Sequence, residues 1–166
     1  MLLAWTGCIA DRTPKDIDAA TLVRAGDTAP NFTTEMLDGG TTTLSALRGK
    51  VVLLTFWASW CPECGREMEV VQRQIVERFA RRPFVFLPVS RGETREAVEA
   101  FVEKHGIAFP VGLDPDGSIY RLYATEYVPR NILIDAQGVV AESTAGYTAE
   151  EFGRLADRIE ALLAPQ

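Results

Sequence analysis

A continuous apolar run that leads into a pair of cysteines constrains the fold of this 166-residue chain more than any other feature. Residues 51–57, Val-Val-Leu-Leu-Thr-Phe-Trp, predict a strand that is buried on both faces of a sheet. The motif Cys61-Pro-Glu-Cys64 follows, and Pro62 suits the first turn of a helix, where no N–H is needed. The amides and the positive dipole end of a helix start stabilise an anion, so Cys61 is biased toward the reactive thiolate. The pattern therefore predicts thiol–disulfide exchange.

Helical and extended patterns alternate along the rest of the chain. The predicted strands after the cysteines cover residues 84–89, 132–134 and 139–141. The predicted helices extend from Pro62 to about Arg82, from Thr94 to near His105, and from Thr148 through Leu162. Two short extended pieces around the turn Asp38-Gly-Gly40 precede these elements. This order predicts an α/β fold, in which a central mixed sheet is flanked by helices on both faces and extended by an N-terminal β-hairpin.

The composition divides the chain at about residue 25. Residues 11–26 are polar and have little periodicity, so we interpret residues 1–25 as a tether and residues 26–166 as one domain. The apolar stretch that ends at Cys8 is similar to the end of a bacterial lipoprotein signal, in which this cysteine would be lipidated. Trp5 and the lack of a basic start depart from that pattern, and we expect an upstream portion to be missing. A free cysteine at a frayed terminus is the alternative.

Composition also bears on ligands and partners. The net charge of −6 argues against nucleic-acid binding, which favours a basic face. No apolar run is long enough to cross a bilayer. The cysteine pair could be half of a zinc site, but zinc needs about four ligands and only Cys8 and His105 remain. We therefore expect no metal and no other cofactor, and we interpret His105 as a structural residue at a helix C-terminus.

Several motifs of the chain together resemble the thioredoxin superfamily. They are Phe56-Trp-Ala-Ser-Trp-Cys-Pro-Glu-Cys64, Val128-Pro129 ahead of Asn131-Ile-Leu-Ile-Asp135, and the lead-in Gly26-Asp-Thr-Ala-Pro-Asn-Phe32. Over about residues 26–163 the chain resembles membrane-tethered, extracytoplasmic thiol–disulfide oxidoreductases of the TlpA/ResA type. The resemblance implies a thioredoxin-like fold, a periplasmic location, disulfide-containing protein substrates and an upstream membrane thiol reductant. Cytochrome c maturation is a common task of that family, and we expect a monomer.

The resemblance also implies roles for individual residues. Cys61 would be the nucleophile that forms a mixed disulfide with a partner, and Cys64 would resolve it. Pro129 would be a cis proline that faces the cysteines and presents backbone to an extended substrate segment. Arg130 would place positive charge near Cys61 or recognise an acidic partner, or it would be a surface residue without a role. The residues expected to contact a substrate are Trp60, Pro62, Glu63, Val128 and Arg130.

Two glutamates near the cysteines are expected to tune them. Glu63 lies beside Cys61 and disfavours the thiolate, which Arg66 offsets only in part, so the couple is expected to be a reductant. Thr55 stands where thioredoxins carry a buried proton-accepting carboxylate, which leaves Glu67 as the nearest candidate base. A solvated helix-surface glutamate is the alternative for Glu67. Related proteins often carry a proline two residues further on, and its absence here predicts a straighter helix.

Two other functions compete with disulfide reduction. A peroxiredoxin-like thiol peroxidase would share the superfamily fold and a similar lead-in. Its Pro-x-x-x-Thr/Ser-x-x-Cys motif is missing, because Leu53 and Leu54 occupy the region where the proline would lie. A redox-inactive, thioredoxin-like binding module is the other alternative, and the intact cysteine pair argues against it. The leading hypothesis is an oxidoreductase that reduces disulfides of extracytoplasmic partner proteins.

Overall fold

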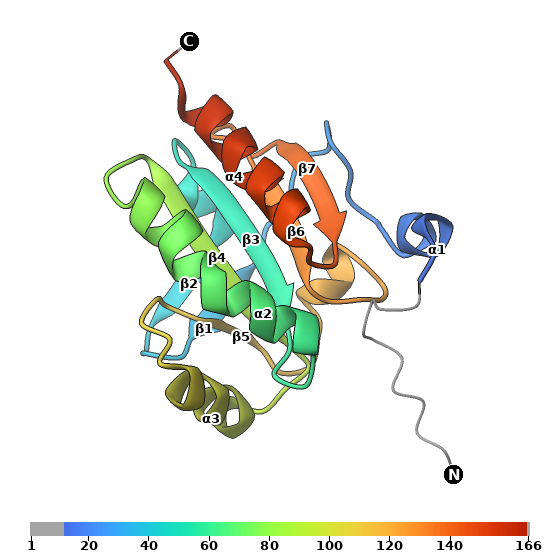
Figure 1. Cartoon of the computed structure of the whole chain (residues 1–166), viewed down its shortest axis with the longest axis vertical. Coiled ribbons are helices and arrows are strands. Elements are labelled where there is room, and N and C mark those ends of the chain that lie inside the picture. Colours follow the sequence, from blue (N-terminus) through green and yellow to red (C-terminus); the bar gives the residue numbers. More distant parts are fainter. Residues whose placement is uncertain (1–11, 166) are drawn as a thin grey trace.

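The apolar run at residues 51–57 forms strand β3 (Val51–Trp57), all of which is buried. In the computed structural model, which describes residues 12–165, β3 pairs in parallel with β4 (Phe84–Arg91) and antiparallel with β6 (Arg130–Ile134). The full strand order is β2-β1-β5-β4-β3-β6-β7 (Figure 1). The other strands are β1 (Thr33–Met36), β2 (Thr41–Thr43), β5 (Gly112–Asp114) and β7 (Val140–Ala145). An interior strand of a mixed sheet is what the uninterrupted apolar pattern predicts.

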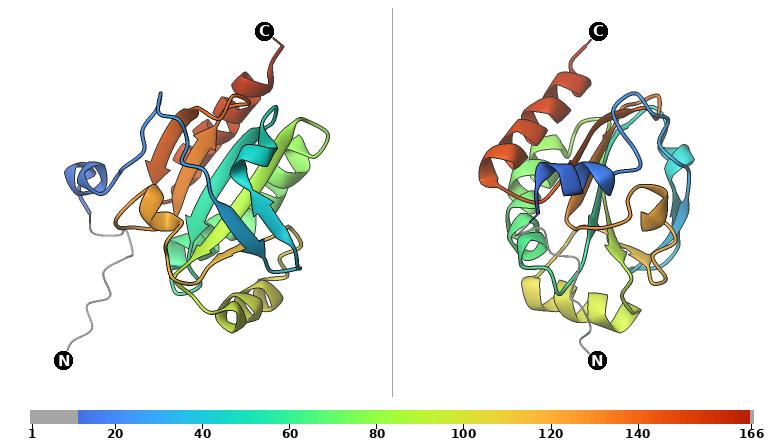
Figure 2. Two further views of the ribbon diagram at one scale, coloured as in Figure 1. Left: turned by 180° about the vertical axis from the view of Figure 1, so that it is seen from behind. Right: turned by 90° about the vertical axis from the view of Figure 1, so that its right-hand side faces the viewer.

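Helices cover both faces of the sheet, as predicted. Figure 2 (right) shows α2 (Pro62–Val71) and α4 (Ala149–Leu163) on one face and the short 3₁₀ helices η1 (Leu44–Leu47) and η3 (Tyr120–Leu122) on the other. Helix α3 (Arg95–His105) lies beyond the end of the sheet at which β3 terminates (Figure 1). The cysteine motif therefore lies just beyond the C-terminal end of the interior strand β3, where α2 begins.

The predicted N-terminal β-hairpin is present as β1 and β2, which pair antiparallel. Gly39 and Gly40 both have positive φ in the turn, a conformation that glycine adopts without a steric cost. Strand β1 also pairs antiparallel with β5, so the hairpin extends the central sheet at one edge.

The helix that carries the cysteines is less regular than the sequence predicts. After α2, residues Gln72–Glu77 form a π-helical segment before the helix ends close to Phe79. The apolar residues Met68, Val71, Ile75 and Phe79 nevertheless all point into the core. A π-helical segment is a recognised source of helix irregularity in the absence of proline. The prediction of a straighter helix stays a prediction.

The described part of the predicted tether is folded against the domain, which corrects that interpretation. Thr13 and Asp16 form a reciprocal capping box that starts a short helix, α1 (Pro14–Ala19). Ala20 and Val23 are buried, and backbone hydrogen bonds join Ala20 and Leu22 to the segment that precedes β6. Apolar burial and backbone pairing outweigh the polar composition of this segment. Cys8 and the predicted lipoprotein signal lie outside the described residues.

Candidate active site

Cys61 occupies the N-cap of α2, directly after the short loop that follows β3. Its Sγ accepts a hydrogen bond from the backbone N–H of Cys64 at 3.3 Å. This N–H would stabilise a thiolate at Cys61, and the N-cap position puts the sulfur at the positive end of the helix dipole. Both cysteine side chains are buried, and only 1% of Cys61 is exposed. The predicted helix start at the cysteine motif is therefore confirmed.

Two acceptors also lie near the Cys61 sulfur. Its Sγ is 3.8 Å from the Glu63 carboxylate and 3.4 Å from the carbonyl oxygen of Val128. An S–H can donate to either acceptor, whereas a thiolate is repelled by both, so these contacts favour the protonated form. Arg66 forms an ion pair with Glu63 at 3.1 Å, but the Arg66 side chain is more than half exposed and solvent weakens its effect.

The Val128–Pro129 peptide bond is cis, as expected from the resemblance. Val128 itself is buried, and it presents its carbonyl oxygen rather than its side chain to Cys61. The segment ahead of β6 thus brings polar backbone to the sulfur from the side opposite α2.

Glu67 is fully buried on α2, one helical turn beyond Cys64, and is not the solvated surface residue that was the alternative. Its Oε2 accepts a hydrogen bond from the Asn131 side-chain amide at 3.0 Å, and its Oε1 has no protein partner. Burial is the main cause that raises the pKa of Glu67 to about 8, and the negative charge of a Cys61 thiolate adds to it. Burial likewise raises the pKa of Cys64, with further contributions from Cys61 and Glu67.

Asn131 is a site residue that the sequence did not reveal. It lies opposite Thr55 in the β3–β6 pair, and the Thr55 hydroxyl donates to its side-chain oxygen at 2.5 Å. Thr55, which stands where thioredoxins carry a buried acid, is therefore one end of a hydrogen-bonded chain of side chains, Thr55–Asn131–Glu67. The only signal in the sequence was a polar residue inside the apolar β6 pattern.

Arg130 is buried, so it is not the surface residue that was one of the alternatives. Its side chain points to the opposite face of the sheet from Asn131, because successive residues of a strand alternate between faces. The guanidinium is buried and donates to the Glu126 carbonyl at 3.0 Å and to the Thr21 hydroxyl at 2.8 Å. Arg130 thereby holds the folded N-terminal segment against the domain.

A surface groove adjoins Cys61 on the side of α3. Trp60 is 40% exposed at its rim, as expected for a residue that contacts partners. His105 stacks on Phe101 with ring centroids 4.1 Å apart and also lines the groove, so it lies much closer to the cysteines than we expected. The α3 C-terminus approaches the motif only in the tertiary structure. The groove is lined by Ser59, Trp60, Cys61, Pro62, Gly65, Arg66, Glu69, Phe101 and His105.

Glu93 anchors the loop that precedes Cys61. Its carboxylate accepts the backbone N–H of Ser59 at 2.9 Å, the Ser59 hydroxyl, and the Ser90 hydroxyl at 2.9 Å. Hydrogen bonds to an ionised acceptor are stronger than neutral ones. This residue, which comes from the loop after β4, was also not singled out by the sequence.

We expect Glu93→Ala to lower the free energy of unfolding by about 1–3 kcal/mol, because three donors lose a charged acceptor. Urea unfolding followed by tryptophan fluorescence measures this change. Glu103→Ala removes an exposed carboxylate from α3 and is expected to change the same free energy by less than about 0.5 kcal/mol. Equal effects of the two substitutions would show that Glu93 does not anchor the loop.

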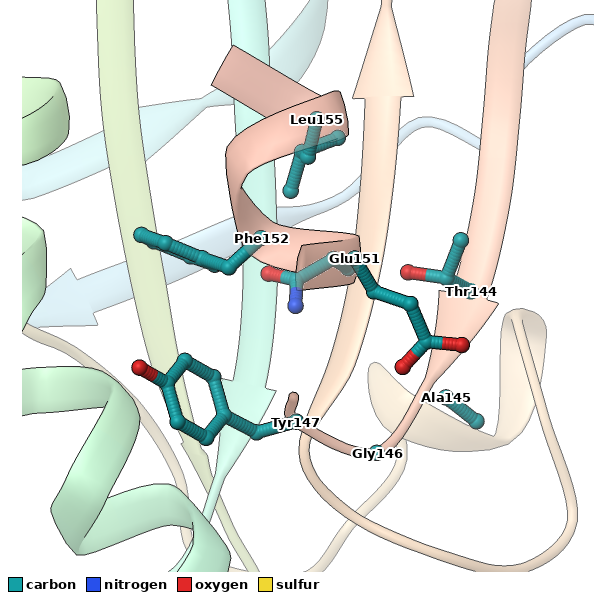
Figure 3. A pocket seen from close by; sticks show the side chains of 8 residues that line it. Thr144, Ala145, Gly146, Tyr147, Glu151, Phe152 and Leu155 are labelled. Carbon is teal, nitrogen blue, oxygen red and sulfur yellow. The ribbon is translucent and has the colours of Figure 1, made fainter. Parts of the chain in front are cut away.

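A small pocket lies between β6, β7 and α4, next to Asn131. It is lined by Asn131, Thr144, Ala145, Gly146, Tyr147, Glu151, Phe152 and Leu155. Figure 3 shows Tyr147 and Phe152 on one side of this pocket and Glu151 and Thr144 on the other. Burial is the main cause that raises the pKa of Tyr147, and the negative charge of Glu67 is the second cause. A side chain of this pocket therefore interacts electrostatically with the buried glutamate.

Two kinds of feature are absent from residues 12–165. No helix in this range is long and apolar enough to span a bilayer. No group of three or more His, Cys, Asp or Glu side chains in the same range is placed to hold a metal ion.

Comparisons with known proteins identify the family. The AhpC/TSA family model matches residues 25–143. The thiol-disulfide oxidoreductase ResA of Geobacillus kaustophilus is 34% identical over 131 residues, which cover 79% of this chain and 75% of that protein. A candidate protein disulfide isomerase from Bacteroides thetaiotaomicron superimposes with a TM-score of 0.83 at 39% identity, over 87% of this chain and 92% of that chain. A candidate thiol:disulfide interchange protein DsbE from Chlorobium tepidum gives 0.80 at 30% identity, over 86% and 99%. The chain therefore has a thioredoxin-like fold and belongs to the AhpC/TSA family.

Proposed function

We propose that the protein is a thiol–disulfide oxidoreductase that reduces disulfides in partner proteins through Cys61 and Cys64. The observation that carries this proposal is the placement of two cysteines at the start of α2, with Cys61 at the N-cap and its sulfur 3.4 Å from the Val128 carbonyl oxygen, ahead of a cis proline. The ResA and DsbE names of the similar proteins support the same chemistry.

The first step uses Cys61 as the nucleophile. Its thiolate attacks one sulfur of the partner's disulfide, the partner's S–S bond breaks, and the other partner sulfur leaves as a thiolate. The product is a mixed disulfide between Cys61 and the partner. The Cys64 N–H stabilises the thiolate before the attack, and the exposed ring of Trp60 lies where a partner would approach.

The second step releases the partner. Cys64 loses its proton and attacks the Cys61 sulfur, which forms the Cys61–Cys64 disulfide and expels the second partner thiolate. The partner gains two electrons and the dithiol loses them. Because the pKa of Cys64 is raised by burial, this thiol needs a base, and the Glu67 carboxylate is the buried base on the same helix.

The surroundings of Cys61 favour reduction over oxidation. Glu63 and the Val128 carbonyl both disfavour the thiolate, and a less stable reduced form makes a couple more reducing.

We propose that a membrane thiol reductant returns the disulfide to the dithiol after each cycle. By the same resemblance, we propose an extracytoplasmic, periplasmic location, a lipid-anchored N-terminus at Cys8, a monomeric state and a task in cytochrome c maturation.

A redox titration of the Cys61–Cys64 couple tests this direction. We expect a midpoint potential well below the ~−120 mV of a strongly oxidising protein and within or below the ~−180 to −270 mV range of isomerases and thioredoxin. The protein is equilibrated in buffers of reduced and oxidised dithiothreitol or glutathione, and its free thiols are then trapped and counted. A midpoint near ~−120 mV would show that the protein is an oxidant.

Activity assays separate the alternatives. Reduction of insulin by the dithiol form, with the disulfide form as product, supports the proposal. Consumption of hydrogen peroxide at the rate of a dedicated peroxidase would favour the peroxidase instead. Partner binding that is unaffected by loss of both cysteines, together with no reductase activity, would favour a binding module.

A further inference from the structure

We propose that Asn131 is a positioning residue for the exchange reaction, and that it fixes and tunes the Glu67 carboxylate through the hydrogen-bond chain Thr55–Asn131–Glu67. This inference rests on the proposed function, because it assigns Glu67 the task of accepting the Cys64 proton.

The two hydrogen bonds of Asn131 allow only one orientation of its side-chain amide. The Thr55 hydroxyl is a donor to the Asn131 side-chain oxygen at 2.5 Å, so that oxygen faces β3. The amide nitrogen must then face α2, where it donates to Glu67 Oε2 at 3.0 Å. All three side chains are at most 2% exposed, so water does not compete for these contacts. Buried polar networks of this kind restrict their members to one arrangement.

Asn131 donates a hydrogen bond to the Glu67 carboxylate, and this bond opposes the effect of burial on the Glu67 pKa. The other groups that face Glu67 are the Cys61 and Cys64 thiols on its own helix and Tyr147 from the loop before α4. Thiolate charge at Cys61 disfavours the ionised carboxylate, whereas the Asn131 N–H stabilises it. Asn131 therefore keeps a usable fraction of Glu67 in the basic form near neutral pH.

This arrangement links Asn131 to one step of the cycle. When Cys64 resolves the mixed disulfide, its proton goes to a Glu67 oxygen and its sulfur forms the bond to Cys61. Cys61 attacks as a thiolate in the first step, so that step needs no proton acceptor such as Glu67. Loss of the Asn131 donor should therefore slow the second step and leave the first step nearly unchanged.

The experiment compares the reduced wild-type protein with Asn131→Ala. A side-chain carboxyl ¹³C NMR titration reports Glu67 directly, and we expect its midpoint to rise from about 8 by about one pH unit or more. Rapid mixing with an aromatic disulfide such as DTNB reports the two steps as two phases of thiolate release. At pH 7 we expect the second phase to slow about tenfold and the first phase to change less than about twofold, because one pKa unit is a tenfold change in the ionised fraction.

Two further variants sharpen the result. Asn131→Asp keeps the side-chain shape but removes the donor, and it should raise the Glu67 midpoint even if the alanine variant folds poorly, because two carboxyl groups then share one site. Ser143→Ala removes a buried hydroxyl without a protein partner from the adjacent strand β7 and should leave both phases unchanged.

An unchanged Glu67 midpoint in both Asn131 variants would overturn the proposal. So would a second phase that slows equally at every pH, since that pattern indicates a merely structural role. These outcomes are distinct from failure of the proposed function: a wild-type protein that reduces no disulfide would refute the reductase, while the NMR titration would still report whether Asn131 tunes Glu67.

Discussion

Cys61→Ser is expected to abolish disulfide reduction, with a fall in the rate of insulin reduction of at least about 1,000-fold. A serine hydroxyl is not ionised near neutral pH and does not attack a disulfide, so the first step is lost. The size of the effect follows from the position of Cys61, since of the two cysteines within residues 12–165 only Cys61 lies beside both the Val128 carbonyl and the surface groove. The rate is measured by the turbidity of precipitating insulin chains.

The matching substitution at Cys64 gives a different result. Cys64→Ala retains the nucleophile but cannot resolve the intermediate, so the partner should stay linked to Cys61 as a mixed disulfide. Non-reducing gel electrophoresis and mass spectrometry detect that adduct. A linked partner on Cys64 in the Cys61→Ser variant, or substantial reductase activity there, would reverse the assigned roles. Ser59→Ala removes the hydrogen bond from the Ser59 hydroxyl to Glu93 in the neighbouring loop, leaves both cysteines in place, and is the control for loop damage.

Glu67→Gln is expected to remove a pH-dependent loss of stability from the reduced protein. In the wild type, the Glu67 carboxyl lowers the free energy of unfolding by about 4–5 kcal/mol between pH 4.5 and about 8. The pKa of Glu67 rises from its ordinary value of 4.5 to about 8 on folding, mainly because the carboxyl group is buried. Below pH 4.5 the group is protonated in both states and does not affect the free energy of unfolding. Between pH 4.5 and about 8 only the unfolded chain releases the proton, so wild-type stability falls as pH rises. Above about pH 8 the carboxyl is ionised in both states and the effect is constant.

Glutamine is neutral at every pH and lacks this dependence. The free energy of unfolding of Glu67→Gln minus that of the wild type should therefore increase steadily from pH 4.5 to about 8 and then level off. Urea denaturation at a series of pH values with a non-thiol reductant measures the difference. Glu69→Gln changes an exposed glutamate on the same helix and should show no such increase. A difference that stays constant from pH 5 to 9 would mean that the Glu67 pKa is not raised by folding.

The cysteine motif shows how far local sequence predicts this fold. A buried strand, a turn and a helix start at Cys61 are determined by residues within a few positions of one another, so the pattern of residues 51–64 was sufficient to place them. The mixed sheet, the N-terminal hairpin and the cis bond before Pro129 were also predicted, the last from the resemblance alone. The short helix α1 was missed although its capping box, Thr-Pro-Lys-Asp, was legible in the sequence.

The surroundings of the cysteines depended on contacts between distant parts of the chain. Asn131 is 64 residues from Glu67 and 76 from Thr55. The β3–β6 register places Asn131 opposite Thr55, and the packing of α2 brings Glu67 to Asn131. The same register turns Arg130 to the opposite face, where it is buried against the N-terminal segment rather than offered to a partner. By itself, the sequence determined a reactive thiol at the end of a buried strand, because strand, turn and helix preferences are local. The tertiary structure alone decided which polar groups share its buried surroundings, because burial and hydrogen bonding across the sheet are set by packing.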